Sequence, residues 1–174
     1  DIAYLDGSGS TIHLTRGVQG TGIAAAALSI SDAATYDYGT HPVGSTTDAT
    51  LTVTNTGGST ATSLTPTGLA TPHAFKGGTY PGTGGTCGTT LVAAGTCTVV
   101  LTYSPVSAAT STKTLKITYN DGAASTNTTR AVSGTAVTAA ILSLNGGATY
   151  DFGSKNVSST TDATLTITNS GGTE

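Results

Sequence analysis

The chain has 174 residues, of which only 9% are charged and 24 are glycine, and its formal net charge is −3. An ordinary soluble domain is about 25% charged. A charged fraction as low as this can indicate a membrane protein, but no run here approaches the roughly 20 apolar residues that span a bilayer. The six Lys and Arg residues are scattered, whereas nucleic-acid binding requires a clustered basic face. Membrane insertion and a nucleic-acid partner are therefore not expected. Abundant threonine and valine favour strands, and the sequence predicts an all-β protein.

One stretch of the sequence occurs twice. Residues 46–55 return as residues 160–169 with a single conservative change, Val53 to Ile167, and the spacing is 160 − 46 = 114 residues. Self-similarity at a fixed spacing is typical of repeat proteins, and a period of this length indicates tandem domains and not the short units of a solenoid.

The repeat divides the chain into three predicted parts. Residues 1–24 match the end of the central unit, with Arg16 aligned to Arg130 at the same spacing, and are predicted to be the C-terminal strands of a preceding repeat. Residues 25–137 form one complete unit. Residues 138–174 repeat only the opening strands and are predicted to belong to a following repeat.

Alternation of apolar and polar residues between turns predicts about seven short strands per repeat and an antiparallel immunoglobulin-like β-sandwich. The predicted strands of the complete unit include residues 26–30, 50–55, 61–65, 97–103, 111–119 and 126–133. Asp6-Gly7 and Asp121-Gly122 are typical hairpin turns. Pro66 is expected to end its strand, and residues 71–88 form a long loop with Phe75 as the expected buried anchor.

The two cysteines, Cys87 and Cys97, allow three interpretations. A metal site needs about four ligands at short spacings, and the three histidines (His13, His41 and His73) lie far apart in the sequence. A catalytic thiol would need a base and an oxyanion hole. A disulfide that closes a small loop is favoured, with a contribution of about 2–3 kcal/mol from loop-closure entropy. Disulfides persist outside the reducing cytoplasm, which indicates an extracellular or periplasmic setting. Of the two, the extracellular cell surface is the expected location.

Five sequence motifs of the central unit carry a family resemblance. They are residues 36–39 (Tyr-Asp-Tyr-Gly), 51–57, 97–105 (Cys-Thr-Val-Val-Leu-Thr-Tyr-Ser-Pro), 114–117 and 132–135. Together they resemble the bacterial choice-of-anchor D repeats, within the ASH (Hydin-like) group of immunoglobulin-like β-sandwiches. The resemblance covers the whole central unit and, more weakly, both flanking parts. The resemblance implies a structural module that occurs in many surface proteins, and it therefore gives almost no information about the function of this chain.

Six charged residues recur at the repeat spacing in a chain that has few charges: Arg16, Arg130, Asp37, Asp48, Asp151 and Asp162. We interpret them as structural ion pairs or as carboxylates that cap turns. A cation site is the alternative, but calcium needs several oxygen ligands at short spacing. The histidines look incidental, and no nucleophile–base order, carboxylate pair or phosphate loop stands out. The chain is therefore not expected to be an enzyme or to bind a cofactor or metal.

Three functions remain open at this point. The leading one is a structural surface protein whose tandem repeats form an extracellular fibre, filament or stalk. The first alternative is an adhesin-type module that recognises a glycan or protein through the 71–88 loop; the second is a spacer of a secreted enzyme. The expected partner is the protein itself, because the flanking parts would expose unpaired sheet edges. Either neighbouring repeats or strands from another chain would complete them.

Overall fold

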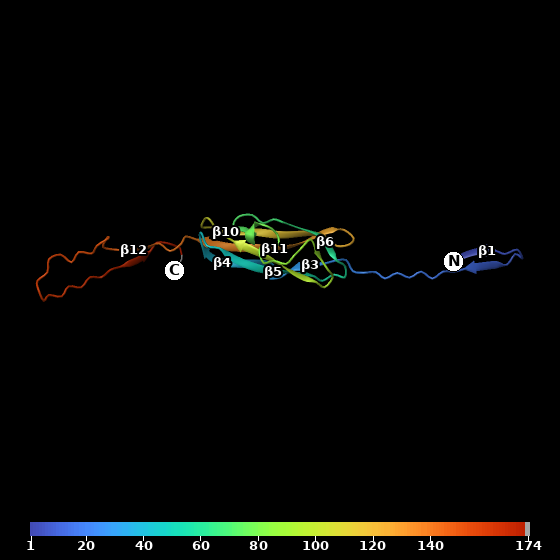
Figure 1. The fold of residues 1–174 in the computed structure, drawn as a ribbon, viewed down its shortest axis with the longest axis horizontal. Coiled ribbons are helices and arrows are strands. Elements are labelled where there is room, and N and C mark those ends of the chain that lie inside the picture. Colours follow the sequence, from blue (N-terminus) through green and yellow to red (C-terminus); the bar gives the residue numbers. More distant parts are fainter. Residues whose placement is uncertain (173–174) are drawn as a thin grey trace.

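The computed structural model describes residues 1–172. A central β-sandwich lies between an N-terminal β-hairpin and a C-terminal two-stranded antiparallel segment, and the chain enters the sandwich at one end and leaves it at the opposite end (Figure 1). The elements are β1 (Ile2–Leu5), β2 (Thr11–Leu14), β3 (Leu28–Ile30), β4 (Thr35–Pro42), β5 (Thr47–Asn55), β6 (Ala61–Thr67), β7 (His73–Phe75), η1 (Lys76–Gly78), β8 (Thr90–Leu91), β9 (Thr96–Tyr103), β10 (Thr110–Asn120), β11 (Ser125–Val137), β12 (Leu142–Leu144) and β13 (Ile167–Asn169).

Two sheets make the sandwich, one of five strands in the order β4-β11-β10-β6-β8 and one of four in the order β3-β5-β9-β7. The predicted all-β immunoglobulin-like fold is confirmed. One pairing differs from the antiparallel expectation, because β4 runs parallel to β11. The chain crosses from one sheet to the other between β3 and β4. Because no hairpin connects β4 to its ladder partner β11, the two strands can run parallel.

The core follows the alternation seen in the sequence. On β9, Cys97, Val99, Leu101 and Tyr103 face inward and are buried, as the period of two requires. The opposing sheet contributes residues such as Leu115, which is also fully buried. Full burial of a large apolar side chain contributes about 1.5–3 kcal/mol, so these layers supply most of the stability of the domain.

Two strand limits differ from the prediction. Pro66 lies inside β6, opposite Ile117 of β10, and does not end the strand. The other neighbour, β8, pairs with β6 only at Ala61 and Thr62. At Pro66 the edge of β6 that faces away from β10 is therefore open. On that side, the N–H that proline lacks would have had no ladder partner. β11 extends to Val137, beyond the predicted end, because β4 pairs with it as far as Pro42.

A β-bulge in β4 directs a tyrosine into the core. Between the pairs Ser133–Asp37 and Thr135–Thr40, two residues of β4 stand opposite one residue of β11, Gly134. The two residues are Tyr38 and Gly39; Gly39 has φ of 78°, a conformation that glycine adopts at little cost. Bulges of this kind change where a side chain points, and the ring of Tyr38 is buried between the sheets.

The flanking segments reproduce the strand registers of the central unit. β12 pairs with β13 through Leu142 and Asn169, and the residues 114 positions earlier, Leu28 and Asn55, pair in the same way in β3 and β5. The β1–β2 hairpin likewise repeats the outer end of the β10–β11 hairpin. Its turn, residues 6–10, holds one residue more than the corresponding turn at 121–124.

Gly134 provides a test of how closely the two sheets pack. A Cβ atom at this position would lie 2.7 Å from the Tyr103 ring, and that ring is fully buried. We expect Gly134→Ala to destabilise the domain by about 1–3 kcal/mol through overpacking, measured by urea unfolding followed by circular dichroism. Gly88→Ala is the control, because nothing lies within 4 Å of its added Cβ. Equal stability of the two variants would contradict the close packing.

Candidate functional site

The most distinctive side-chain cluster in the domain is aromatic and lies at one end of the sandwich. His73 of β7 and Tyr103 of β9 are cross-strand neighbours, and their ring centroids are 4.9 Å apart. Tyr38 reaches them from the other sheet and stacks on Tyr103 at 5.3 Å. The three rings, here called the aromatic cluster, therefore join β4, β7 and β9 across both layers.

The aromatic cluster buries polar atoms that have no hydrogen-bond partner among the described residues. These atoms are the hydroxyl oxygens of Tyr38 and Tyr103 and Nδ1 of His73, while Nε2 of His73 lies 3.4 Å from the carbonyl oxygen of Ser111. Burial raises the pKa of both tyrosine hydroxyls and lowers the pKa of the His73 imidazole, because it disfavours the charged forms. The cluster is consequently uncharged at neutral pH.

The sequence interpretation treats the histidines as incidental, whereas the structure places His73 in β7 with only 1% of its surface exposed. Phe75, the predicted anchor of the loop, is partly buried against the core, so His73 fills the more central position. No sequence pattern indicates this burial, since a lone histidine after Pro72 in a glycine-rich stretch belongs to no alternating series of apolar residues. Its burial depends on β7 pairing with β9, which is a long-range contact.

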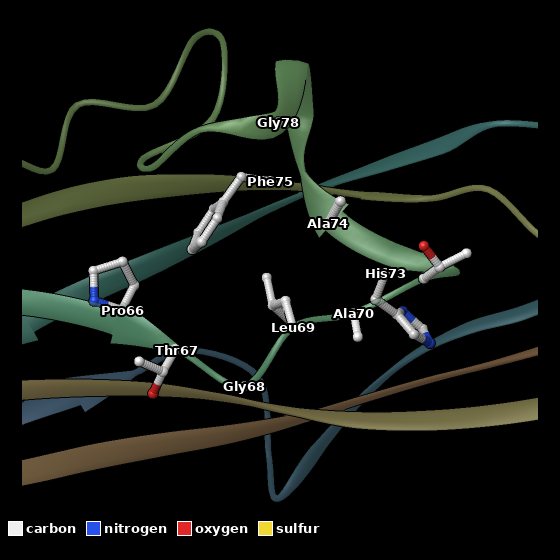
Figure 2. Close-up of a pocket in the computed structure, with 10 residues that line it drawn as sticks. Pro66, Thr67, Gly68, Leu69, Ala70, His73, Ala74, Phe75 and Gly78 are labelled. Carbon is white, nitrogen blue, oxygen red and sulfur yellow. The ribbon is translucent and has the colours of Figure 1, made fainter.

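A cavity of about 360 Å³ lies beside the cluster, between the end of β6 and the β7–η1 segment. Figure 2 shows Leu69, Phe75 and Pro66 around this space, with the imidazole of His73 pointing away from Phe75. The Phe75 ring is fixed by an edge contact with Tyr80 at 5.5 Å. Polar and apolar atoms share the wall about equally, so the cavity could accept a small group that presents both an apolar face and hydrogen-bonding atoms.

The predicted disulfide between Cys87 and Cys97 is present. Cys97 lies at the start of β9, so the bond fixes the end of the 71–88 loop to a core strand. Further contacts hold the same loop: Val100 of β9 donates its N–H to the carbonyl oxygen of Pro81 at 2.8 Å, and Thr98 donates its N–H to Oγ1 of Thr86 at 2.9 Å. The loop is thus attached along the length of β9.

Asp48 forms an ion pair with a lysine of the loop and not with an arginine. Its Oδ2 lies 2.8 Å from Nζ of Lys76, and its Oδ1 accepts a hydrogen bond of 2.6 Å from the Thr102 hydroxyl. These two bonds, that from Lys76 above all, lower the pKa of the Asp48 carboxyl. The group is partly exposed, so the pair orients the loop more than it stabilises the fold.

Two of the other recurring carboxylates cap turns. Oδ1 of Asp37 accepts the N–H of Gly39 at 2.9 Å, and Oδ1 of Asp151 accepts that of Gly153 at 2.7 Å. The same carboxylate-capped turn, with its glycine at positive φ, therefore forms in both copies of the Tyr-Asp-aromatic-Gly motif. Asp162 is exposed and, within residues 1–172, forms no ion pair with any of the other recurring charges.

Neither recurring arginine meets a carboxylate within the described residues. Arg130 donates from Nη2 to the backbone carbonyl oxygen of Ile30, across the two sheets, whereas Arg16 lies exposed in the segment after β2. The charged-pair interpretation is thus replaced for Arg130 by a side-chain-to-backbone bond. Such a bond satisfies the carbonyl of the edge strand β3 in a part-buried place, where hydrogen bonds to charged groups contribute most.

No helix among residues 1–172 is long and apolar enough to cross a membrane. The same residues contain no group of three or more His, Cys, Asp or Glu side chains arranged to hold a metal ion.

The architecture and the disulfide-anchored loop define an immunoglobulin-like β-sandwich module. The sequence model of the HYDIN/CFA65/VesB-like Ig-like domain matches residues 27–135. The chain belongs to this family, which confirms the Hydin-like resemblance seen in the sequence motifs.

Among the solved structures, the VesB protease supports the same fold. The VesB protease of Vibrio cholerae is similar with a TM-score of 0.51 and 16% identity, over 62% of this chain and 31% of that one. The ASH/PapD-like domain 7 of human CEP192 gives a TM-score of 0.47 and 17% identity, over 74% of this chain and 96% of that one. This chain thus corresponds to about a third of the VesB chain. No curated protein sequence matches it.

The first prediction from this region concerns the disulfide. Replacing both Cys87 and Cys97 by alanine should lower the free energy of unfolding by about 2–3 kcal/mol, because a loop of this length is no longer closed in the unfolded chain. Urea unfolding of the parent with a reductant in the buffer should give the same loss, and the double variant should not respond to the reductant. A parent protein as stable as the variant under oxidising conditions would contradict the prediction.

The second prediction concerns pH. The pKa of His73 is lower in the folded state than its usual 6.5, so the folded protein binds this proton less readily than the unfolded chain does. The stability that His73 contributes is complete above pH 6.5 or so and is lost as the pH falls towards the folded-state pKa.

Urea unfolding across this pH window measures the effect. His73→Phe should flatten the decline in stability, because the variant keeps an aromatic ring and removes the titrating group. His13→Phe is the matched control and should keep the parental slope, since His13 lies in the exposed β1–β2 hairpin. An unchanged slope in His73→Phe would contradict the assignment.

Proposed function

We propose that the chain is a stretch of a structural surface protein in which tandem immunoglobulin-like repeats form an extracellular fibre, filament or stalk. The observation that carries the proposal is a difference in burial between equivalent positions. Leu142 is 68% exposed, whereas its counterpart Leu28 in the central unit is 8% exposed. Ile167 is 69% exposed and its counterpart Val53 is fully buried. The flanking strands thus have the sequence and register of sandwich strands and lack the layer that would cover them.

The path of the chain supports an end-to-end arrangement of such units. The two flanking strand pairs lie beyond opposite ends of the central sandwich (Figure 1), so successive units would extend along one axis. Only residues 138–141 separate β11 from β12. A linker this short restricts the angle between neighbours far more than a flexible glycine–serine linker would.

A close contact is repeated at both junctions. A Cβ atom on Gly57 would lie 2.1 Å from the carbonyl oxygen of Ala25, and one on Gly171 would lie 2.0 Å from that of Ala139. In each copy, the turn after the strand packs directly on the backbone of the segment that enters the unit. This supports a stiff junction between repeats, of the kind that a stalk or filament needs.

The compartment is also part of the proposal. The disulfide is typical of proteins outside the reducing cytoplasm, and we place the chain at the cell surface. The partner we propose is further copies of the same repeat, and we assign no catalytic role to the sandwich.

Two alternatives have specific support. The cavity beside Phe75 would suit an adhesin-type module that binds a glycan or protein next to the 71–88 loop. The likeness of the fold to part of the VesB protease would suit a spacer attached to a secreted enzyme.

Limited proteolysis of the native protein, followed by denaturing and reducing electrophoresis, tests the proposal. A fibre or stalk of tandem repeats should give a parent mass far above 16.9 kDa and a ladder of fragments one 114-residue repeat apart, because cleavage at the same exposed loop in successive repeats gives fragments that differ by whole repeats. Fragments that lack this spacing and carry hydrolase activity would instead support the spacer. Specific glycan binding that Phe75→Ala abolishes would support the adhesin.

A further inference from the structure

Two valines are the only large apolar side chains of residues 25–137 that are largely exposed, and they lie at opposite ends of the sandwich. Val92, in the turn from β8 to β9, is 61% exposed, and Val106, in the turn from β9 to β10, is 76% exposed. These turns stand at the two ends of β9, so each end of the domain carries one valine. Single exposed apolar residues are common on protein surfaces, and the meaning of this pair therefore depends on what surrounds each valine.

Val106 lies beside a hollow at the exit end, the end with turn 104–109, where the chain leaves the sandwich (Figure 1). The hollow has a volume of about 280 Å³ and is lined by Val106, Tyr103, Pro72 and Pro105, together with residues at the start of β10. No charged side chain lines it, and the two proline rings restrict the backbone of its wall. A hollow of this kind suits a small apolar side chain presented by a neighbouring turn.

Consecutive units already touch each other at one point. A Cβ atom on Gly58 would lie 3.2 Å from Cγ2 of Ile23, and one on Gly172 would lie 3.2 Å from Cβ of Val137. Ile23 and Val137 are 114 positions apart, as are Gly58 and Gly172. In both junctions, therefore, the end of one unit's last strand meets the same turn glycine of the next unit.

At the entry end, which consists of turns 56–60 and 92–95, this contact is continuous with Val92. The Asn55 side chain donates from Nδ2 to the carbonyl oxygen of Ser59 at 2.8 Å and to that of Val92 at 3.2 Å. Asn55 is fully buried, so it holds the two turns together as one surface.

At the exit end, the same contact is continuous with Val106. Val43 donates its N–H to the carbonyl oxygen of Val137 at 2.8 Å, and Gly44 donates its N–H to that of Pro105 at 2.9 Å. The end of β11 is thus joined through one turn to the turn that carries Val106. Each end of the sandwich extends from the observed contact towards one exposed valine.

We propose that consecutive repeats pack end to end, with the turn equivalent to that of Val92 in one repeat seated in the hollow beside Val106 of the repeat before it. The proposal rests on the proposed function of tandem repeats and deepens it by naming the partner of each end. A head-to-tail contact between two unlike surfaces does not close on itself, so each added repeat extends the same line. Burial of both valines at the junction would also restrict bending between neighbours.

Carbene footprinting with mass spectrometry tests the contact by comparing the native protein with the 174-residue chain, which holds one complete unit. Val92 and Val106 should be labelled several-fold less in the native protein, because a neighbouring repeat covers each of them there. Lys116 is the control, since it is exposed within β10 and should be labelled equally in both proteins. Equal labelling of the two valines in both proteins overturns the proposal.

A pair of variants of the native protein tests whether Val106 holds the junction closed. Val106→Asp should raise the rate of proteinase K cleavage at residues 138–141 several-fold, because a charge in the contact separates the two repeats. Thr112→Asp makes the same change on the exposed side of β10 and should keep the parental rate. Circular dichroism checks that both variants remain folded, and a parental cleavage rate in Val106→Asp contradicts the packing.

This test is separate from that of the proposed function. A native protein that gives the 114-residue ladder but leaves both valines fully labelled keeps the tandem-repeat function and refutes the end-to-end packing. A native protein that gives no such ladder contradicts the function itself.

Discussion

The ring of Tyr103 fixes how closely the two sheets approach each other. It is fully buried, it stacks on Tyr38 of the opposite sheet, and its edge occupies the space that a side chain at position 134 would need. Several other features depend on this ring. Position 134 must be glycine, the bulge in β4 must turn Tyr38 inward, and the 71–88 loop must begin with a strand that places His73 beside the ring. Since all three rings are uncharged, the cluster tolerates burial of polar atoms that a charged group would not.

Local patterns in the sequence predicted the local parts of this arrangement. The alternation from Cys97 to Tyr103 gave β9 and its buried face, and Asp121-Gly122 gave the β10–β11 hairpin, because both depend on neighbouring residues. The cysteine count favoured the disulfide. The parts that were missed depend on distant contacts. Pro66 continues its strand only because β8 is short, and His73 is buried only because β7 pairs with β9. Of the recurring charges, Arg130 was expected in a structural role, but its backbone acceptor on Ile30 lies 100 residues away.

The flanking segments separate what local sequence can specify from what it cannot. β12 and β13 pair in the register of β3 and β5, because the alternating pattern of the two strands, which is the same in both copies, sets the register. Burial of the same side chains needs strands of the opposing sheet, and the exposed Leu142 lacks that cover. Two-stranded pairs are marginal in water on their own. The hydrophobic positions of a repeat therefore favour any arrangement that brings the missing layer to them, within a chain or between chains.

The attachment of the 71–88 loop bears on the choice between a structural and a binding role. A binding loop usually gains from freedom to adapt to its ligand, whereas this loop is held by the disulfide at Cys87, by Lys76 on Asp48, and by the backbone bond from Val100 to Pro81. These three attachments lie on β9 or on its neighbour β5, the two strands at the centre of the four-stranded sheet. A loop attached in this way reinforces the sandwich, which is the property that a repeated load-carrying module requires.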